Sequence, residues 1–221
     1  MNLSKSLDYF DPINQVDAAI HIIGVGAMGS RVAELLVRLG VPKIHIWDMD
    51  TVEDKNIANQ LYLHSHIGMK KTDALESFLL DINPNLKVSK HEEYTNQALA
   101  GYIFLCVDNI ELRHKIATSN KENPYVKGMF DTRMRLEDAQ SYGAKWDDEK
   151  QKETFINSMD FTHEEAKEAT PVSACGTTLS VASTVVSTAA HTVANFMNLI
   201  RTNKCDSMIF INAFEHTIIK F

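Results

Sequence analysis

The sequence has few of the features that mark secreted, disulfide-stabilised or zinc-binding proteins. Its three cysteines, Cys106, Cys175 and Cys205, lie far apart and make an odd number. This usage argues against a disulfide framework and excludes a Cys-X-X-Cys zinc site. The first eleven residues contain no apolar run of the kind found in a secretory signal. We therefore expect a cytoplasmic protein, in a reducing compartment, without structural zinc.

Positive charge and long apolar runs are also scarce. The chain has 22 Lys and Arg against 29 Asp and Glu, a net charge of −7, so it lacks the basic excess typical of a nucleic-acid-binding face. Its most apolar stretch, 172–200, is interrupted by Ser, Thr, His and Asn, whereas a membrane span needs about 20 nearly continuous apolar residues. We expect an ordinary globular protein that neither binds nucleic acid nor crosses a membrane.

Strand and helix patterns alternate from about residue 18. Short apolar runs predict strands at 19–25, 43–47, 86–89, 102–107 and 125–130, and helical spacing predicts helices at 30–39, 70–80 and 109–119. Strands that alternate with helices favour right-handed βαβ units. The sequence therefore predicts an α/β fold, with a Rossmann-like doubly wound, mostly parallel sheet and a nucleotide-binding core at 18–131.

The pattern changes after Asp131. Residues 133–144 are consistent with a hairpin, 177–200 with a long core helix, and 207–212 with 216–221 with a closing hairpin. Residues 146–170 are rich in Asp, Glu and Lys with little apolar periodicity. They are open to three interpretations: a solvated helix, a mobile excursion or a plain charged surface. We predict one domain over 1–221, in which 132–221 form an antiparallel C-terminal extension.

A glycine-rich turn joins the first predicted strand to the first predicted helix. It reads Gly24-Val25-Gly26-Ala27-Met28-Gly29. Glycines in this position let the backbone approach a phosphate, which then meets the free N–H groups of the helix N-terminus. Asp48 ends the second strand, where an acid hydrogen-bonds a ribose hydroxyl in Rossmann-type sites. These features predict a nucleotide, but they fit an NAD-dependent oxidoreductase as well as an ATP-binding protein, and a turn that binds nothing is also compatible with them.

The segment after Asp48 separates these alternatives. It reads D-M-D-T-V-E-D-K-N-I-A-N-Q-L-Y, followed by H-I-G-M-K-K-T-D-A, and C-V-D-N at 106–109 precedes Arg113. This order resembles the ThiF/MoeB/HesA (ubiquitin-activating-enzyme-like) family, whose pattern is Asp-X-Asp, Val-Glu, Asn, Arg-Gln, Gly-X-X-Lys and then Cys-X-Asp-Asn-X-X-X-Arg. The resemblance covers nearly the whole chain. The matching positions before the cysteine are Asp48, Asp50, Val52, Glu53, Asn56, Gln60, Gly68 and Lys71.

The resemblance implies an ATP site and an activating reaction. Lys71 would supply a point charge to the triphosphate, and Asp108 would hold Mg²⁺ through one carboxylate; taken singly, a surface lysine and a helix N-cap are the alternatives. The implied reaction is ATP-dependent adenylylation of the C-terminal carboxylate of a ubiquitin-like protein or peptide, carried out by a homodimer. The implied nucleotide-binding residues are Gly24, Gly26, Ala27, Gly29, Asp48, Asp50, Asn56, Gln60, Lys71, Asp108 and Asn109.

Three departures from the family pattern bear on catalysis. Asn59 stands where the family has an arginine over the phosphates, and an uncharged amide cannot neutralise developing negative charge. Arg133 and Arg135 are candidates for a substitute cation, and ordinary salt bridges are the alternative for both. The chain also lacks the N-terminal Arg-rich segment and the zinc tetrad of many members. A pseudoenzyme that binds nucleotide or a partner without turnover is therefore an alternative function.

Cys175 is a further candidate for catalysis. It lies in S-A-C-G-T-T ahead of the predicted long helix, and a thiol at a helix N-terminus has a lowered pKa and is more nucleophilic. The alternative is a small buried residue at a helix start. Cys106 and Cys205 are expected to be inert. The nine histidines show no ligand spacing, and we interpret them as surface residues.

Overall fold

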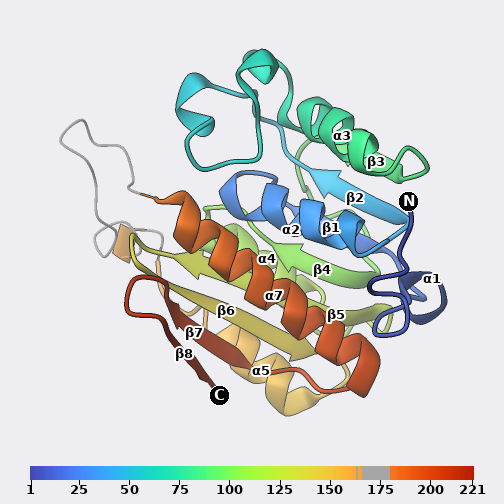
Figure 1. Ribbon diagram of the computed structural model, residues 1–221. Coiled ribbons are helices and arrows are strands. Elements are labelled where there is room, and N and C mark those ends of the chain that lie inside the picture. The colour runs from blue at the N-terminus through green and yellow to red at the C-terminus, as the bar shows by residue number, and fades with distance from the viewer. Residues whose placement is uncertain (163, 166–179) are drawn as a thin grey trace.

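The computed structural model describes residues 1–162, 164–165 and 180–221, and in these ranges eight strands form one sheet (Figure 1). The strand order is β3-β2-β1-β4-β5-β6-β7-β8. The first five strands in this order run parallel, and each pair from β5 to β8 is antiparallel. The strands are β1 (Ile20–Ile23), β2 (Lys43–Trp47), β3 (Lys87–His91), β4 (Gly101–Leu105), β5 (Val126–Met134), β6 (Asp138–Lys145), β7 (Met208–Asn212) and β8 (Thr217–Lys220).

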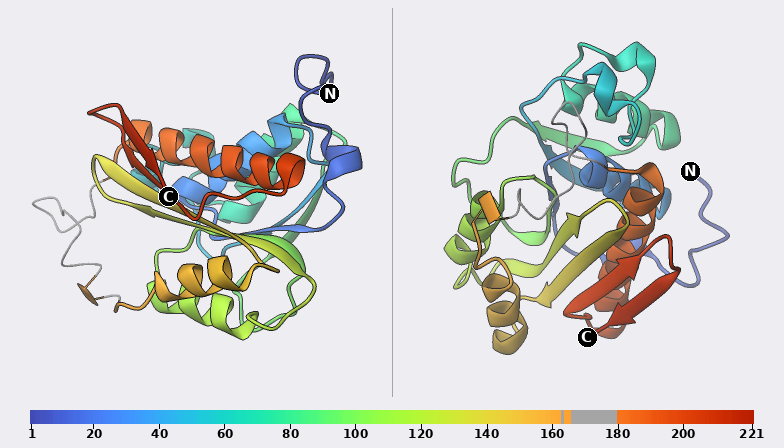
Figure 2. Two further views of the ribbon diagram at one scale, coloured as in Figure 1. Left: turned by 90° about the horizontal axis from the view of Figure 1, so that it is seen from below. Right: turned by 90° about the vertical axis from the view of Figure 1, so that its left-hand side faces the viewer.

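Helices cover both faces of this sheet (Figure 2). On one face lie α2 (Ala27–Arg38), α3 (Lys71–Ile82) and α7 (Ala182–Thr202), and on the other lie α4 (Ile110–Ser119) and α5 (Glu149–Asn157). A short helix α1 (Pro12–Gln15) precedes β1, and two 3₁₀ turns, η1 (Asp54–Asn56) and η2 (His64–His66), lie between β2 and α3. The predicted Rossmann-like, mostly parallel α/β fold with an antiparallel C-terminal part is confirmed.

The central strands are buried because helices pack on both sides of them. Every residue of β1 and β4 is buried, as expected of inner parallel strands. On the side of α2 and α7, Phe104 and Phe130 stack at 5.0 Å between ring centroids, and Phe196 of α7 packs edge-on against both. None of the described helices is long and apolar enough to span a bilayer.

The C-terminal extension differs in detail from the prediction. The predicted hairpin at 133–144 exists, but its first strand is the end of β5, so the parallel and antiparallel parts share one strand across Asp131. Residues 149–157 form α5, whose Phe155 packs against Trp146 in the core between the sheet and α4. A free excursion is therefore wrong for this part, and the rest of 146–170 lies partly outside the described residues. The long helix and the closing hairpin are confirmed as α7 and β7–β8.

Candidate nucleotide-binding site

The predicted nucleotide-binding residues gather at the carboxyl ends of the parallel strands. From β1 the chain leads to β2 on one side of it, while β4 lies on the other side. Such a reversal of strand order opens the crevice in which open α/β sheets bind their ligands. The Gly turn follows β1, Asp48 follows β2, and Asp108 follows β4 by three residues.

The Gly turn is held against β4 by close backbone contacts. Gly24 has a φ of +86°, and a Cβ on it would lie 2.7 Å from the backbone nitrogen of Val107. A Cβ on Gly29 would lie 1.9 Å from the carbonyl oxygen of Gly24. Only glycine fits these two positions. Gly26 is the N-cap of α2 and offers no side-chain cap, so the N–H groups of Ala27 and its neighbours remain available to an anion.

Asp48 ties the Gly turn to the end of β2. Its Oδ2 accepts a hydrogen bond from the backbone N–H of Val25 at 2.9 Å, and its Oδ1 accepts one from Asp50 N–H at 2.9 Å. A carboxylate has about four lone-pair sites, so these two bonds leave acceptors for a ribose hydroxyl. These two bonds fix the orientation of the Asp48 carboxylate and leave it able to accept further hydrogen bonds.

Lys71 begins α3 and points at the two aspartates that end β2. Its Nζ lies 2.7 Å from Asp50 Oδ2 and 4.0 Å from Asp48 Oδ1. The lysine side chain is 9% exposed, whereas that of Asp50 is 59% exposed. Lys71 is therefore not a surface lysine. Its ammonium is buried beside the Gly turn, paired with a carboxylate that can turn away into solvent.

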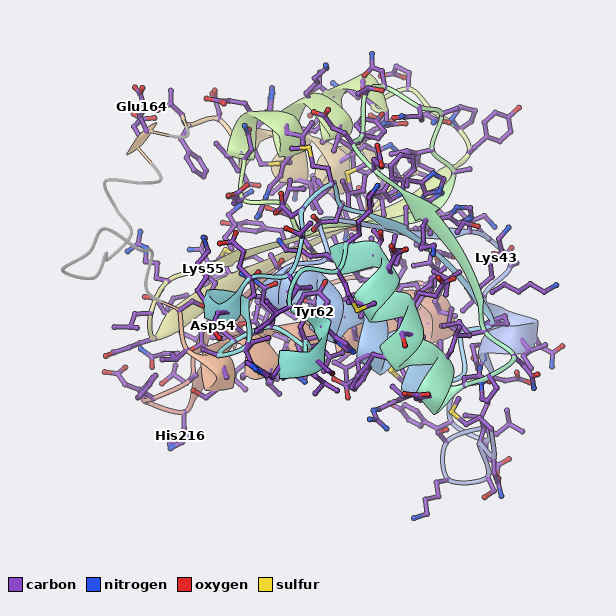
Figure 3. All side chains as sticks on the ribbon, turned by 90° about the horizontal axis from the view of Figure 1, so that it is seen from above. Lys43, Asp54, Lys55, Tyr62, Glu164 and His216 are labelled. Atoms are coloured by element: carbon purple, nitrogen blue, oxygen red, sulfur yellow. The ribbon has the colours of Figure 1, made fainter. Side chains whose placement is uncertain are left out.

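Tyr62 joins the elements of this site and was not anticipated from the sequence. Its hydroxyl donates to the carbonyl oxygen of Val25 at 2.6 Å and lies 3.4 Å from the carbonyl oxygen of Lys71. Burial raises the pKa of Tyr62, and the charges of Asp48 and Asp50 raise it further, so the hydroxyl stays protonated and keeps donating. The tyrosine lies on the segment between β2 and α3 that also carries Asp54 and Lys55 (Figure 3). An aromatic residue in a polar connection was the only signal for it.

Asn56 and Gln60 lie on the same segment. Asn56 is buried, and its Oδ1 accepts from the N–H of Glu53 at 2.8 Å, which closes the η1 turn. Gln60 has a buried Oε1 without a hydrogen-bond partner, and its Nε2 lies 4.0 Å from where a Cβ on Gly26 would be. A buried amide oxygen without a partner is costly, which fits a side chain that awaits a ligand. The half-buried Asn59 precedes it.

Asp108 and Asn109 follow β4, and only Asn109 caps the next helix. Asn109 is the N-cap of α4, since its Oδ1 accepts from Leu112 N–H at 2.8 Å. The N-cap alternative for Asp108 is therefore wrong. Asp108 is exposed, and its carboxylate makes no hydrogen bond or ion pair with the residues that the structure describes. A free carboxylate next to the Gly turn suits a Mg²⁺ ion whose other ligands are phosphate oxygens and water.

Arg133 and Arg113 converge on a buried carboxylate behind this edge. Asp131 accepts from Arg113 Nη1 at 2.5 Å and from Arg133 Nε at 2.6 Å. Arg133 also donates to the backbone and hydroxyl oxygens of Ser158 at 2.6 and 2.8 Å. Each of its three guanidinium nitrogens thus has a protein acceptor. Arg135 is exposed in the β5–β6 turn.

Of the three cysteines, Cys175 lies outside the described residues. Burial raises the pKa of Cys106 to about 12 and that of Cys205 to about 12, in agreement with inert thiols.

Several histidines are not on the surface, so the interpretation of all nine as surface residues is wrong. His21, His45 and His91 lie on adjacent strands with Trp47. The His45 and His91 rings approach to 3.2 Å between Nδ1 and Nε2, and Trp47 Nε1 donates to His21 Nδ1 at 3.3 Å. Within the described ranges, no three His, Cys, Asp or Glu side chains are grouped to hold a metal ion.

The fold and this edge define a Rossmann-like α/β protein with a candidate nucleotide-binding site. The chain belongs to the ThiF family, whose model matches residues 14–218. It is 29% identical over 126 residues to ubiquitin-like modifier-activating enzyme 5 of Caenorhabditis elegans, covering 48% of this chain and 30% of that protein. With the Branchiostoma floridae enzyme of the same name it shares 32% identity over 130 residues, 50% of this chain and 32% of the relative. The matches thus span about a third of these relatives.

Solved structures share the fold. E. coli MccB with ATP superimposes with a TM-score of 0.72 at 16% identity, over 94% of this chain and 64% of MccB. MccB with selenomethionine-labelled MccA gives a TM-score of 0.74 at 18% identity, over 100% of this chain and 72% of MccB. PaaA gives 0.73 at 16% identity, over 94% of this chain and 74% of PaaA. At such low identity these likenesses establish the architecture.

Proposed function

We propose that this protein catalyses the ATP-dependent adenylylation of the C-terminal carboxylate of a ubiquitin-like protein or a peptide. The observation that carries the proposal is the convergence of the Gly turn, Asp48 and Lys71 at one edge of the sheet. Membership of the ThiF family supports it, as do relatives that are named ubiquitin-like modifier-activating enzymes. The structures of MccB with ATP and with MccA support ATP and a protein or peptide as the two substrates.

Each element of the edge has a role in this reaction. Asp48 holds the ribose, and the uncapped N–H groups at the start of α2 hold phosphate oxygens. When ATP binds, the Lys71 ammonium breaks its ion pair with Asp50 and pairs with the triphosphate instead. The Asp50 side chain is exposed, so water can then solvate its carboxylate. Gln60 gains a partner for its orphaned amide oxygen. Asp108 holds Mg²⁺, which supplies positive charge to the phosphates when bound.

The chemistry is a displacement at the α-phosphorus. A carboxylate oxygen of the acceptor forms a bond to this phosphorus, the bond to the bridging oxygen breaks, and pyrophosphate leaves. The product is an acyl-adenylate. The protein contributes positioning and charge neutralisation, which together account for most of the catalysis expected in such a step. We further propose a cytoplasmic homodimer of a zinc-free branch of the family, with Cys175 and Arg133 as secondary candidates for catalytic roles.

One observation favours a second function, a pseudoenzyme that binds nucleotide without turnover. Asn59 is half-buried next to Gln60, so an uncharged amide occupies the position at which the family pattern has arginine. An NAD-dependent oxidoreductase is disfavoured, because a hydride-transfer site has no need for a buried lysine paired to Asp50 beside the Gly turn.

Pyrophosphate exchange tests the proposal against the pseudoenzyme. The protein is incubated with ATP·Mg²⁺, labelled pyrophosphate and a ubiquitin-like protein that ends in Gly-Gly, with the same protein lacking these two glycines as control. We expect slow exchange that requires the Gly-Gly end. Loss of one preorganised donor costs about 100- to 1000-fold in rate, so Asn59→Arg should accelerate exchange if its side chain reaches the phosphates.

Variants of Arg133 and Arg135 distinguish a relocated cation from a missing one. If the natural protein is fast and Arg133→Ala or Arg135→Ala abolishes its exchange, the cation comes from β5 or from the turn after it. If no variant exchanges pyrophosphate while ATP still binds, the adenylylation proposal is wrong and the pseudoenzyme stands.

A further inference from the structure

Negative charge dominates the edge that is proposed to receive a triphosphate. Asp48, Asp50 and Asp108 contribute three carboxylates there, and Lys71 contributes one ammonium that is already paired with Asp50. A triphosphate brings several more negative charges. In a partly buried site such charges repel strongly unless cations offset them. A Mg²⁺ ion at Asp108 would add two positive charges, which is fewer than the negative charges of the three carboxylates and the triphosphate together. The site therefore needs positive charge beyond that of Lys71 and Mg²⁺.

Arg113 of α4 and Arg133 of β5 have a protein acceptor on every guanidinium nitrogen. Arg113 donates to the carbonyl oxygens of Val107 and Thr132 and to Asp131, and Arg133 donates through all three nitrogens to Asp131 and Ser158. Asp131 is fully buried, so if either arginine moved away, the negative charge of this carboxylate would be less well neutralised. Moving either side chain toward a phosphate would therefore be costly.

Arg31 is different, because its guanidinium is only partly used. Its Nη1 lies 3.1 Å from Glu34 Oε2, while its Nε is buried and has no hydrogen-bond partner. Glu34 is shared, since it also accepts from Arg38 Nε at 2.9 Å. The three residues together carry one surplus positive charge. Because the Arg31 side chain is 25% exposed, it has room to change rotamer.

The position of Arg31 places this surplus charge next to the Gly turn. Ala27 is the first residue of α2, and Arg31 follows it by one turn on the same face of the helix. Four residues correspond to about 6 Å along the axis, a distance that an extended arginine side chain spans. Helical side chains also lean toward the N-terminus, which here is the uncapped end that faces the crevice.

We propose that Arg31 leaves Glu34 when ATP binds and donates to the β- and γ-phosphates, so that it supplies part of the positive charge that Asn59 lacks. This inference rests on the proposed function. Glu34 keeps Arg38 as its partner when Arg31 moves, so the exchange leaves no carboxylate unpaired. The adenosine and α-phosphate end of the nucleotide remains with Asp48 and the Gly turn.

Calorimetric titration of Arg31→Ala with ATP·Mg²⁺ and with AMP tests the proposal. A hydrogen bond to a charged group is worth enough that its loss should weaken ATP binding about ten- to a hundredfold, whereas AMP, which lacks the outer phosphates, should bind as to the natural protein. The control is Arg38→Ala, which removes the other arginine of the same glutamate but keeps the Arg31 guanidinium. It should weaken ATP binding much less than Arg31→Ala does and leave AMP binding unchanged. Arg31→Gln, which preserves most of the side-chain stem, serves if the alanine variant is unstable.

The outcomes separate the inference from the function beneath it. Unchanged ATP affinity in Arg31→Ala, or an equal loss for ATP and AMP, overturns the role of Arg31 and leaves the proposed function standing. Failure of the natural protein to bind ATP overturns both. Adding Asn59→Arg to Arg31→Ala should restore ATP affinity more than Asn59→Arg raises it in the natural protein, because either cation serves the same phosphates. Strictly additive effects of the two substitutions would contradict the inference.

Discussion

Replacing Tyr62 with phenylalanine should destabilise the protein through a single hydrogen bond. The Tyr62 hydroxyl is buried and donates to the Val25 carbonyl oxygen at 2.6 Å. Phenylalanine keeps the ring and leaves this carbonyl without its donor, which costs about 1–3 kcal/mol in a buried setting. For a chain of this size, each kcal/mol of lost unfolding free energy lowers the melting temperature by about 2–4 °C. The melting temperature of Tyr62→Phe should therefore fall by about 2–12 °C.

Urea denaturation followed by circular dichroism measures the same loss as a free energy of unfolding. The midpoint should fall with an unchanged m-value, since the surface exposed on unfolding is the same. Tyr94→Phe is the matched control, because Tyr94 is also buried but its hydroxyl makes no hydrogen bond with the described residues. Its change should stay within about 0.5 kcal/mol. Equal effects of the two substitutions would refute the role assigned to the Tyr62 hydroxyl.

Three further predictions concern protonation, thiols and nucleotide. Burial, followed by the charges of His45 and His91, lowers the pKa of His21 from 6.5 to about 4. The folded protein therefore prefers neutral His21, so this contribution to stability is complete above pH 6.5. It is lost as the pH falls from 6.5 toward 4. Urea midpoints across this range should fall less steeply in His21→Gln, and parallel curves would contradict the assignment. Cys106 should react slowly with iodoacetamide near neutral pH because burial raises its pKa to about 12; faster labelling of Cys175 is expected if that thiol is a nucleophile, and equal rates would return it to a structural role. ATP·Mg²⁺ at about 100 times its dissociation constant should add roughly 2.7 kcal/mol of stability. Asp48→Ala and Lys71→Ala should each remove most of this gain in a thermal melt, and an undiminished gain would exclude them from the site.

The fold was predictable because its signals are local. Short apolar runs that end in glycine or aspartate indicate inner parallel strands. The Gly turn indicates where β1 ends and α2 begins. The order of motifs also predicts that Asp48, Lys71 and Asp108 lie at one edge of the sheet, where the structure has them. The exact end of β5 was missed, since a strand shared by parallel and antiparallel neighbours has no break in its pattern.

The contacts within the site were less predictable because they depend on tertiary pairing. The Lys71–Asp50 ion pair joins residues 21 positions apart, and the orphaned Nε of Arg31 reflects packing around α2. The buried histidines were missed for a similar reason. His21 and His45 become neighbours only through the β1–β2 register, which no ligand spacing along the chain reveals.

Calorimetric titration of the natural protein with ATP·Mg²⁺ and with NAD tests the central claim most directly. The buried Lys71 beside the Gly turn favours a triphosphate, so we expect saturable binding of ATP·Mg²⁺ and none of NAD at the same concentrations. Binding of NAD without binding of ATP would contradict the account.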